Sequence, residues 1–295
     1  MTTAVFKYMD PATIQPSIKP WNKVDGGGMS FKLADYQHSV ENIRGQEDKF
    51  SINTSGFAVY NAPAEEKLFT DDNAVRNGYY SEIEQIIKDK LPGVKKVVLF
   101  DHTIRRRVKD APRQPVQQVH VDQTPAAAAA RVRRHLPAQE AEELLKGHYQ
   151  LVNIWRPIEN PASDHPLAVI DWRSTVPEDF VPVDLLYPTR ENDDGDDRGK
   201  EAAPKTIDDV NTDGYQAKGE TFGVAPSEKH RFFYYKDMTP EEVMFIKCFD
   251  SDSQTMVGNK GVAHATPHTA FADPQTAEDA PGRQSIEVRA LIFYE

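Results

Sequence analysis

Short stretches of alternating apolar and polar residues recur through most of the chain, and this spacing is typical of β-strands. Other short runs, such as 243–250, are apolar almost throughout, as expected for strands buried on both faces. The pattern predicts strands at 50–60, 95–101, 116–122, 148–156, 167–171, 230–236, 243–250 and 285–294.

Helical spacing is rarer. Apolar residues predict a first helix over 78–91. Thr124 followed by Pro125 predicts the start of a second helix, because threonine caps helix N-termini and proline fits the first turn. Pro137 ends this helix, and a short third one is predicted over 138–146.

The two least regular stretches lie at the N-terminus and past the middle of the chain. Residues 1–47 are rich in proline, glycine and polar groups and predict an extended N-terminal arm. Residues 189–219 carry a cluster of carboxylates and predict a flexible acidic loop, because the spacing lacks the EF-hand pattern of a calcium site. Taken together, the many short strands and few helices predict one mainly β domain over 1–295, which is a barrel or sandwich with buttressing helices.

The composition limits the classes of binding partner. The formal net charge of -11 repels phosphate backbones, so we expect no nucleic-acid partner. The basic run Arg105–Arg107 is either a local anion site or a solvated face, and the solvated face is the favoured interpretation. Cys248, the one cysteine, lies in an apolar run and is expected to be a buried structural thiol, which suits a reducing compartment. No secretory signal or membrane-length apolar run is visible, which favours a cytoplasmic protein of unspecified oligomeric state.

His120 and Asp122 are two residues apart on a predicted strand, so their side chains point to the same face. Two histidines and one carboxylate on one side of a metal form the facial triad of non-haem iron(II) oxygenases, which leaves positions open for a cosubstrate and dioxygen. A third ligand is therefore needed late in the chain. The candidates are His268, among small and apolar neighbours, and the weaker His264.

Arg283, Ser285, Glu287 and Arg289 alternate with apolar residues on the last predicted strand, so they share the face opposite the core. An arginine fork with a serine hydroxyl suits the distal carboxylate of a dicarboxylate cosubstrate. An exposed strand face with arginine–glutamate pairs would give the same pattern. The nearby triad favours the binding role.

Four segments together resemble a fungal and bacterial oxygenase group that includes gibberellin desaturase, the aspergillic-acid-pathway hydroxylase/desaturase and the cephalosporin methoxylation proteins. These segments are 120–123, 153–158, 266–271 and 283–289. The resemblance implies a double-stranded β-helix (jelly-roll) core, with Fe(II) as the metal and 2-oxoglutarate and dioxygen as cosubstrates. It places the metal ligands at His120, Asp122 and His268.

The same resemblance places the distal carboxylate of 2-oxoglutarate on Arg283. Arg289 is similar to the second arginine of the nucleic-acid repair dioxygenases and would bind 2-oxoglutarate or an anionic substrate. Tyr149, Asn153 and Trp155 share one face of their predicted strand and are candidates for the substrate pocket. Arg156 would face away and form a structural ion pair.

The sequence therefore favours an iron(II)- and 2-oxoglutarate-dependent oxygenase. We expect it to hydroxylate or desaturate a small secondary metabolite with release of succinate and carbon dioxide. Two alternatives remain open from the residues. One is a metal-dependent hydrolase or isomerase on a cupin-like barrel, which would have no need of Arg283 and Ser285. The other is a non-catalytic partner protein.

Overall fold

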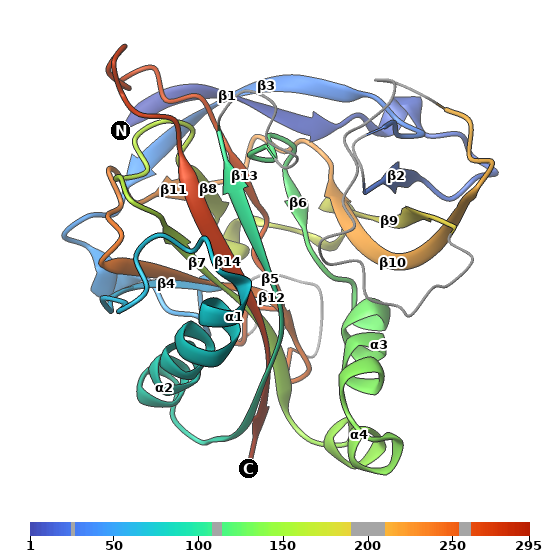
Figure 1. The fold of residues 1–295 in the computed structure, drawn as a ribbon. Helices are drawn as coiled ribbons and strands as arrows, with labels where there is room; N and C mark the ends of the chain where they lie inside the picture. The colour runs from blue at the N-terminus through green and yellow to red at the C-terminus, as the bar shows by residue number, and fades with distance from the viewer. Residues whose placement is uncertain (25–26, 108–113, 190–209, 254–260) are drawn as a thin grey trace.

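Two curled sheets make up most of the molecule (Figure 1). The structure is a computed structural model that describes residues 1–24, 27–107, 114–189, 210–253 and 261–295. The larger sheet has nine strands, which are in spatial order β1 (Thr2–Met9), β3 (Leu33–Asn42), β11 (Phe232–Tyr234), β8 (Leu167–Ile170), β13 (His268–Ala270), β6 (His120–Val121), β10 (Tyr215–Val224), β9 (Phe180–Pro188) and β2 (Trp21–Lys23).

The smaller sheet has five strands and carries the last strand of the chain near its edge. Its spatial order is β4 (Phe57–Asn61), β12 (Glu242–Asp250), β7 (Tyr149–Pro157), β14 (Gln284–Tyr294) and β5 (Val94–Arg106). Every strand pairing in it is antiparallel. The expected mainly β architecture is confirmed.

The alternation predicted for the last strand is also confirmed. Ile286, Val288, Ala290 and Ile292 are fully buried and pack with the helix α2 (Tyr80–Lys90) on the outer face of the five-stranded sheet. Because side chains alternate along a strand, the polar row of β14 faces the space between the two sheets. That space also receives an apolar cluster from both sheets, which includes Trp155, Val169 and Phe233.

The helices lie outside the sheets (Figure 1). The predicted helix over 78–91 is longer than expected. It consists of α1 (Asp72–Ala74), a π-helical turn (Val75–Tyr79) and α2 (Tyr80–Lys90). The predicted cap is confirmed, since the Thr124 hydroxyl accepts from the Ala127 backbone N–H at the start of α3 (Pro125–His135). The short α4 (Ala138–Leu144) follows as predicted. No helix in the described ranges is both long and apolar enough to cross a membrane.

The N-terminal segment, predicted as an extended arm, contributes the strands β1, β2 and β3 to the larger sheet. Strand β1 pairs with β3 over eight residues, and Phe6 and Tyr8 are buried in the core of the larger sheet. Most of the predicted acidic loop, residues 190–209, lies outside the described residues. Its last part, 215–219, belongs to β10 and pairs with β9, so the loop prediction is wrong there.

Arg156 corrects another expectation. Its guanidinium is fully buried and donates to the Tyr79 hydroxyl at 2.8 Å and to the carbonyls of Ala62 and Pro240 at 2.6 and 2.5 Å. No carboxylate of the described residues takes part, so the predicted ion pair is wrong. Three neutral acceptors satisfy this cation where β7 meets the helical layer. Cys248 is buried, as expected.

Candidate metal centre

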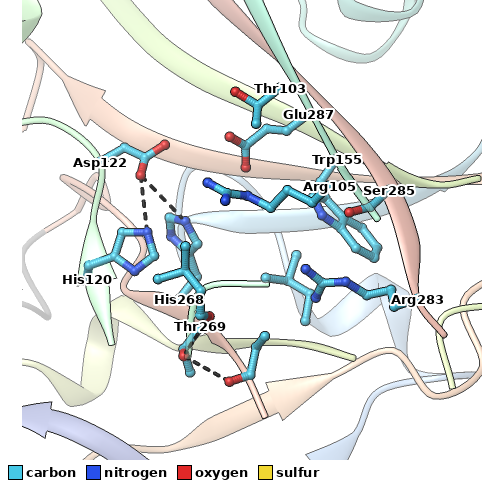
Figure 2. Close-up of a pocket in the computed structure, with 13 residues that line it drawn as sticks. Thr103, Arg105, His120, Asp122, Trp155, His268, Thr269, Arg283, Ser285 and Glu287 are labelled. Atoms are coloured by element: carbon cyan, nitrogen blue, oxygen red, sulfur yellow. Dashed lines mark hydrogen bonds and ion pairs between the residues drawn. The ribbon is translucent and has the colours of Figure 1, made fainter. Parts of the chain in front are cut away.

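His120, Asp122 and His268 come together because β6 and β13 are paired. His268 lies directly opposite His120 in the antiparallel register, which brings two side chains of the same face to about 5 Å at their Cβ atoms. Asp122 follows two residues after His120 and points the same way. One ligand atom of each residue lies within 4.8 Å of the others (Figure 2).

The two imidazoles are oriented by main-chain carbonyls. His120 Nδ1 lies 2.7 Å from the Gln118 carbonyl oxygen, and His268 Nδ1 lies 3.0 Å from that of Thr266. A carbonyl can only accept, so each Nδ1 carries the proton and donates it. Each Nε2 then points toward Asp122, at 3.2 Å for His120 and 3.9 Å for His268, and is the atom of each ring that would face a metal ion. Such second partners are usual for metal-ligating histidines.

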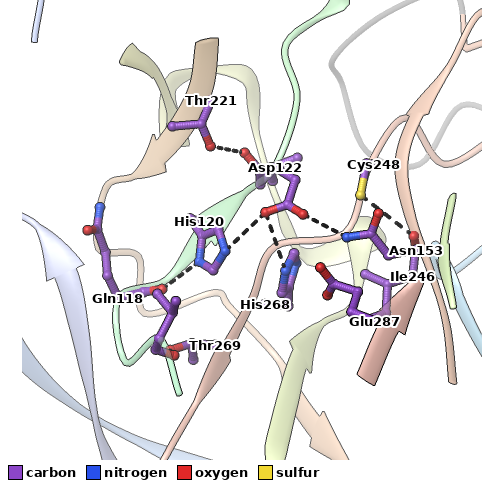
Figure 3. A network of polar contacts seen from close by, with 12 residues as sticks. Gln118, His120, Asp122, Asn153, Thr221, Ile246, Cys248, His268, Thr269 and Glu287 are labelled. Atoms are coloured by element: carbon purple, nitrogen blue, oxygen red, sulfur yellow. Dashed lines mark hydrogen bonds and ion pairs between the residues drawn. The ribbon is translucent and has the colours of Figure 1, made fainter. Parts of the chain in front are cut away.

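Asp122 is held from the opposite side by Asn153, whose amide donates to Oδ2 at 2.7 Å (Figure 3). Burial raises the pKa of the Asp122 carboxyl, but the His120 hydrogen bond and the nearby His268 and Arg289 charges outweigh it and hold the pKa well below its usual value. Asp122 is therefore an anion at neutral pH, as a metal ligand requires.

A pocket opens beside the three residues and extends between the sheets (Figure 2). The pocket is open to solvent on one side, and both polar and apolar side chains line it. Strands from both sheets contribute to its wall. The lining residues are Thr103, Arg105, Val116, His120, Asp122, Trp155, Leu167, His268, Thr269, Ala270, Arg283, Ser285 and Glu287.

Arg283 enters this pocket from just before β14. It is 4% exposed, donates from Nη1 to the His165 carbonyl at 2.7 Å, and places its guanidinium 5.5 Å from the centre of the Trp155 ring. Its Nε is buried without a hydrogen-bond partner. Burial lowers the pKa of Arg283 to about 9, so the group still carries its charge at neutral pH. A buried cation with an unused hydrogen-bond donor is a binding site for an anion.

Arg289 does not line the pocket, which corrects the expectation of direct 2-oxoglutarate contact. Its guanidinium lies behind the triad, where it donates to Glu287 at 2.8 Å and to Thr103 at 2.9 Å. It also lies 3.2 Å from Asp101 and 3.7 Å from Asp122. These four oxygen-bearing side chains surround the Arg289 guanidinium. Arg289 therefore stabilises the Asp122 and Glu287 carboxylates from the side away from the pocket.

The three residues of β7 proposed for the substrate pocket have different surroundings in the structure. Trp155 lines the pocket and Asn153 contacts Asp122. Tyr149 shares their face but lies in an apolar cluster with Phe249 and Phe293, so its placement in the pocket is wrong. A strand rises about 3.3 Å per residue, so Tyr149 is about 13 Å from Asn153 along β7.

His264, the weaker candidate for third ligand, lies apart from the triad. It packs against Trp172 and Phe249, and both ring nitrogens are buried without a hydrogen-bond partner. Burial lowers the pKa of His264 to about 4. The ring is therefore neutral and structural.

This burial predicts a pH dependence of stability. Between about pH 6.5 and 4 the unfolded chain protonates His264 while the folded chain does not, so the free energy of unfolding falls as pH drops. The loss across this window is up to about 3 kcal/mol. Urea unfolding of wild type and His264→Leu at pH 7 and pH 4.5 should show a smaller acid-induced loss in the variant. Equal losses would contradict the assignment.

Seven lining residues were not singled out from the sequence as pocket residues, and Thr103, Arg105 and Glu287 are among them. The usable signal was the alternation on the last strand, which places Glu287 on the same face as Arg283 and Ser285. The contribution of β5 depends on strand pairing, in which Thr103 lies opposite Glu287 and Arg105 opposite Ser285. Nothing in the local sequence of β5 shows that pairing.

Comparisons with known proteins give the family of this chain. The chain matches the family model described as "Oxidoreductase/YMDC permease-like domain" over residues 6–293. It is 28% identical to the hydroxylase/desaturase efuI of Hormonema carpetanum over 322 residues, covering 100% of this chain and 98% of that protein. It is 30% identical to the hydroxylase/desaturase poxK of Penicillium oxalicum over 268 residues, covering 86% of this chain and 78% of that protein.

The fold is likewise similar to a solved structure, the iron and alpha-ketoglutarate-dependent endoperoxidase NvfI. The TM-score is 0.80 at 25% identity, over 99% of this chain and 98% of that one. A jelly roll with two histidines, one carboxylate and a buried arginine in one pocket is typical of non-haem iron oxygenases. The chain belongs to the Fe(II)/2-oxoglutarate-dependent hydroxylase/desaturase family, as its sequence motifs indicated.

Proposed function

We propose that this chain hydroxylates or desaturates a small organic molecule, with Fe(II) on His120, Asp122 and His268 and with 2-oxoglutarate on Arg283 and Ser285. The observation that carries the proposal is the shared pocket. A three-residue metal-ligand set and a buried arginine with an unused Nε line the same cavity. A hydrolase or isomerase would need the metal ligands but not the buried cation.

The residues present fit the metal. Two neutral imidazole nitrogens and one carboxylate oxygen are a donor set that Fe(II) accepts, and the coordination positions left over suit a chelating 2-oxo acid and dioxygen. The bound iron supplies activation of dioxygen for attack on a substrate C–H bond, coupled to oxidation of 2-oxoglutarate to succinate and carbon dioxide.

The protein itself supplies orientation and exclusion of water. The Gln118 and Thr266 carbonyls keep the Nε2 atoms of both histidines directed at the site. Asn153 fixes one Asp122 oxygen so that the other faces the histidines. Trp155 stacks near Arg283 and fixes the plane of the guanidinium. The apolar side chains Val116 and Leu167 cover part of the pocket wall and limit the entry of water.

The proposed substrate is a small secondary metabolite, because the similar proteins carry hydroxylase/desaturase names. We propose a reducing, cytoplasmic setting on the basis of the single buried cysteine. The net charge of -11 makes nucleic acid an unsuitable partner.

The test is a visible absorption spectrum recorded without oxygen. Fe(II) is added to metal-free protein, followed by 2-oxoglutarate. A weak charge-transfer band that requires both additions is the expected result, because the 2-oxo acid then chelates the iron. Bound iron with no such band would overturn 2-oxoglutarate as the cosubstrate. It would favour a hydrolase-like or non-catalytic role.

A further inference from the structure

The three arginines Arg105–Arg107 have different surroundings, because side chains alternate between the two faces of β5. Arg106 donates to the Leu68 carbonyl at 2.8 Å, away from the pocket. Arg107 forms a bidentate pair with Asp164, at 2.9 Å to each carboxylate oxygen. Arg105 lines the pocket, and its Nη1 donates to the neutral Gln114 carbonyl at 3.0 Å. One arginine of the run is thus directed into the site.

Strand pairing fixes this position. Arg105 lies directly opposite Ser285 in the antiparallel register of β5 and β14. Directly opposed residues have Cβ atoms about 5 Å apart, so Arg105 extends over the same part of the pocket that Ser285 and Arg283 reach. Figure 2 shows the Arg105 side chain between the triad and Arg283.

The electrostatics agree with this position. After burial, the charge of Arg105 is the next cause that lowers the pKa of Arg283, while the Asp164 and Glu287 carboxylates raise it. The Arg105 charge therefore acts on Arg283 within the same pocket. Two guanidinium groups in one pocket repel each other, and a bound anion reduces this repulsion beyond what the Glu287 carboxylate in the pocket wall provides. A dianion satisfies both, and it also meets the unused Nε of Arg283.

We propose that Arg105 is a second cation for the dicarboxylate cosubstrate and that it binds 2-oxoglutarate together with Arg283. This inference rests on the proposed function and adds to it a residue from the opposite strand. The ligand class is a 2-oxo dicarboxylate. Arg105 acts by binding and positioning, and its stem also narrows the pocket beside Trp155 (Figure 2).

The experiment measures binding without turnover. Protein loaded with Mn(II), which replaces Fe(II) without oxygen chemistry, is titrated by calorimetry with 2-oxoglutarate and separately with 2-oxopentanoate, which lacks the distal carboxylate. Arg105→Gln is compared with Arg106→Gln, the matched removal of one charge from the same run. Arg105→Lys keeps the charge and covers the case in which the glutamine variant does not fold.

Arg105→Gln should weaken 2-oxoglutarate binding by at least about 10-fold, while Arg106→Gln stays close to wild type. Arg105→Lys should fall between them. Weakening of 2-oxoglutarate alone supports contact with the distal carboxylate, and weakening of both acids supports contact with the 2-oxo acid end. Wild-type affinity in Arg105→Gln, or equal weakening in both glutamine variants, would overturn the proposal. Failure of wild type itself to bind 2-oxoglutarate would instead overturn the proposed function.

Discussion

Replacing Asp122 with alanine is expected to weaken iron binding by at least about 100-fold and to abolish formation of succinate from 2-oxoglutarate. Loss of a residue that merely supports a metal ligand costs about 10- to 100-fold in affinity, so loss of the only carboxylate ligand should exceed this. The remaining pair, His120 and His268, would lack the negative charge that offsets the cation. Metal content after dialysis and succinate release measure the two effects.

Asp101→Ala is the matched control for this variant. Asp101 also lies against the Arg289 guanidinium, at 3.2 Å, but it is outside the triad. It should retain bound iron and the charge-transfer band, which separates loss of a ligand from loss of a carboxylate near Arg289. Equal iron content in Asp122→Ala and wild type would remove Asp122 from the ligand set. Thermal unfolding checks that both variants are folded.

The features of the candidate site that follow from the sequence alone are those governed by one strand at a time. His120 and Asp122 share a face because strand side chains alternate, and the row from Arg283 to Glu287 follows from the same rule. The apolar faces of the same strands show which side is core. Local periodicity therefore gives the face on which each residue lies, while the pairing of β6 with β13 brings His268 to the other two ligands.

The parts that were missed depend on pairing and on distance along a strand. Arg105 reaches the pocket only because β5 pairs with β14 in a particular register. Tyr149 has the correct face but lies too far along β7. Arg289 has the correct face too, yet it is held by Glu287, Thr103 and Asp101 behind the triad. None of these contacts is encoded by local spacing.

The N-terminal strands illustrate the same limit at the level of the fold. Thr2–Met9 alternates buried and exposed positions, but the proline- and glycine-rich sequence that follows suggested an arm. Its partner β3 lies more than twenty residues later, and β3 in turn pairs with β11 from the last third of the chain. Non-local pairing of this kind makes the sheet and leaves little trace in a short window of sequence.

Arg283→Gln is expected to weaken 2-oxoglutarate binding by about 100-fold while leaving iron binding unchanged. A charge-assisted bidentate contact contributes about 3 kcal/mol, and each 1.4 kcal/mol is about tenfold in affinity. The burial of Arg283 strengthens the effect, because no water replaces the lost donor easily. The charge-transfer band recorded against 2-oxoglutarate concentration gives the dissociation constant.

The same variant contains its own control. Binding of 2-oxopentanoate, which has no distal carboxylate, should change little on Arg283→Gln, because the contact that is lost concerns that carboxylate alone. A parallel loss for both acids would mean that the substitution distorts the pocket, for example by releasing Trp155 or the His165 carbonyl from the guanidinium. Unchanged affinity for 2-oxoglutarate would transfer the anchoring role to Arg105, the other arginine that lines the pocket.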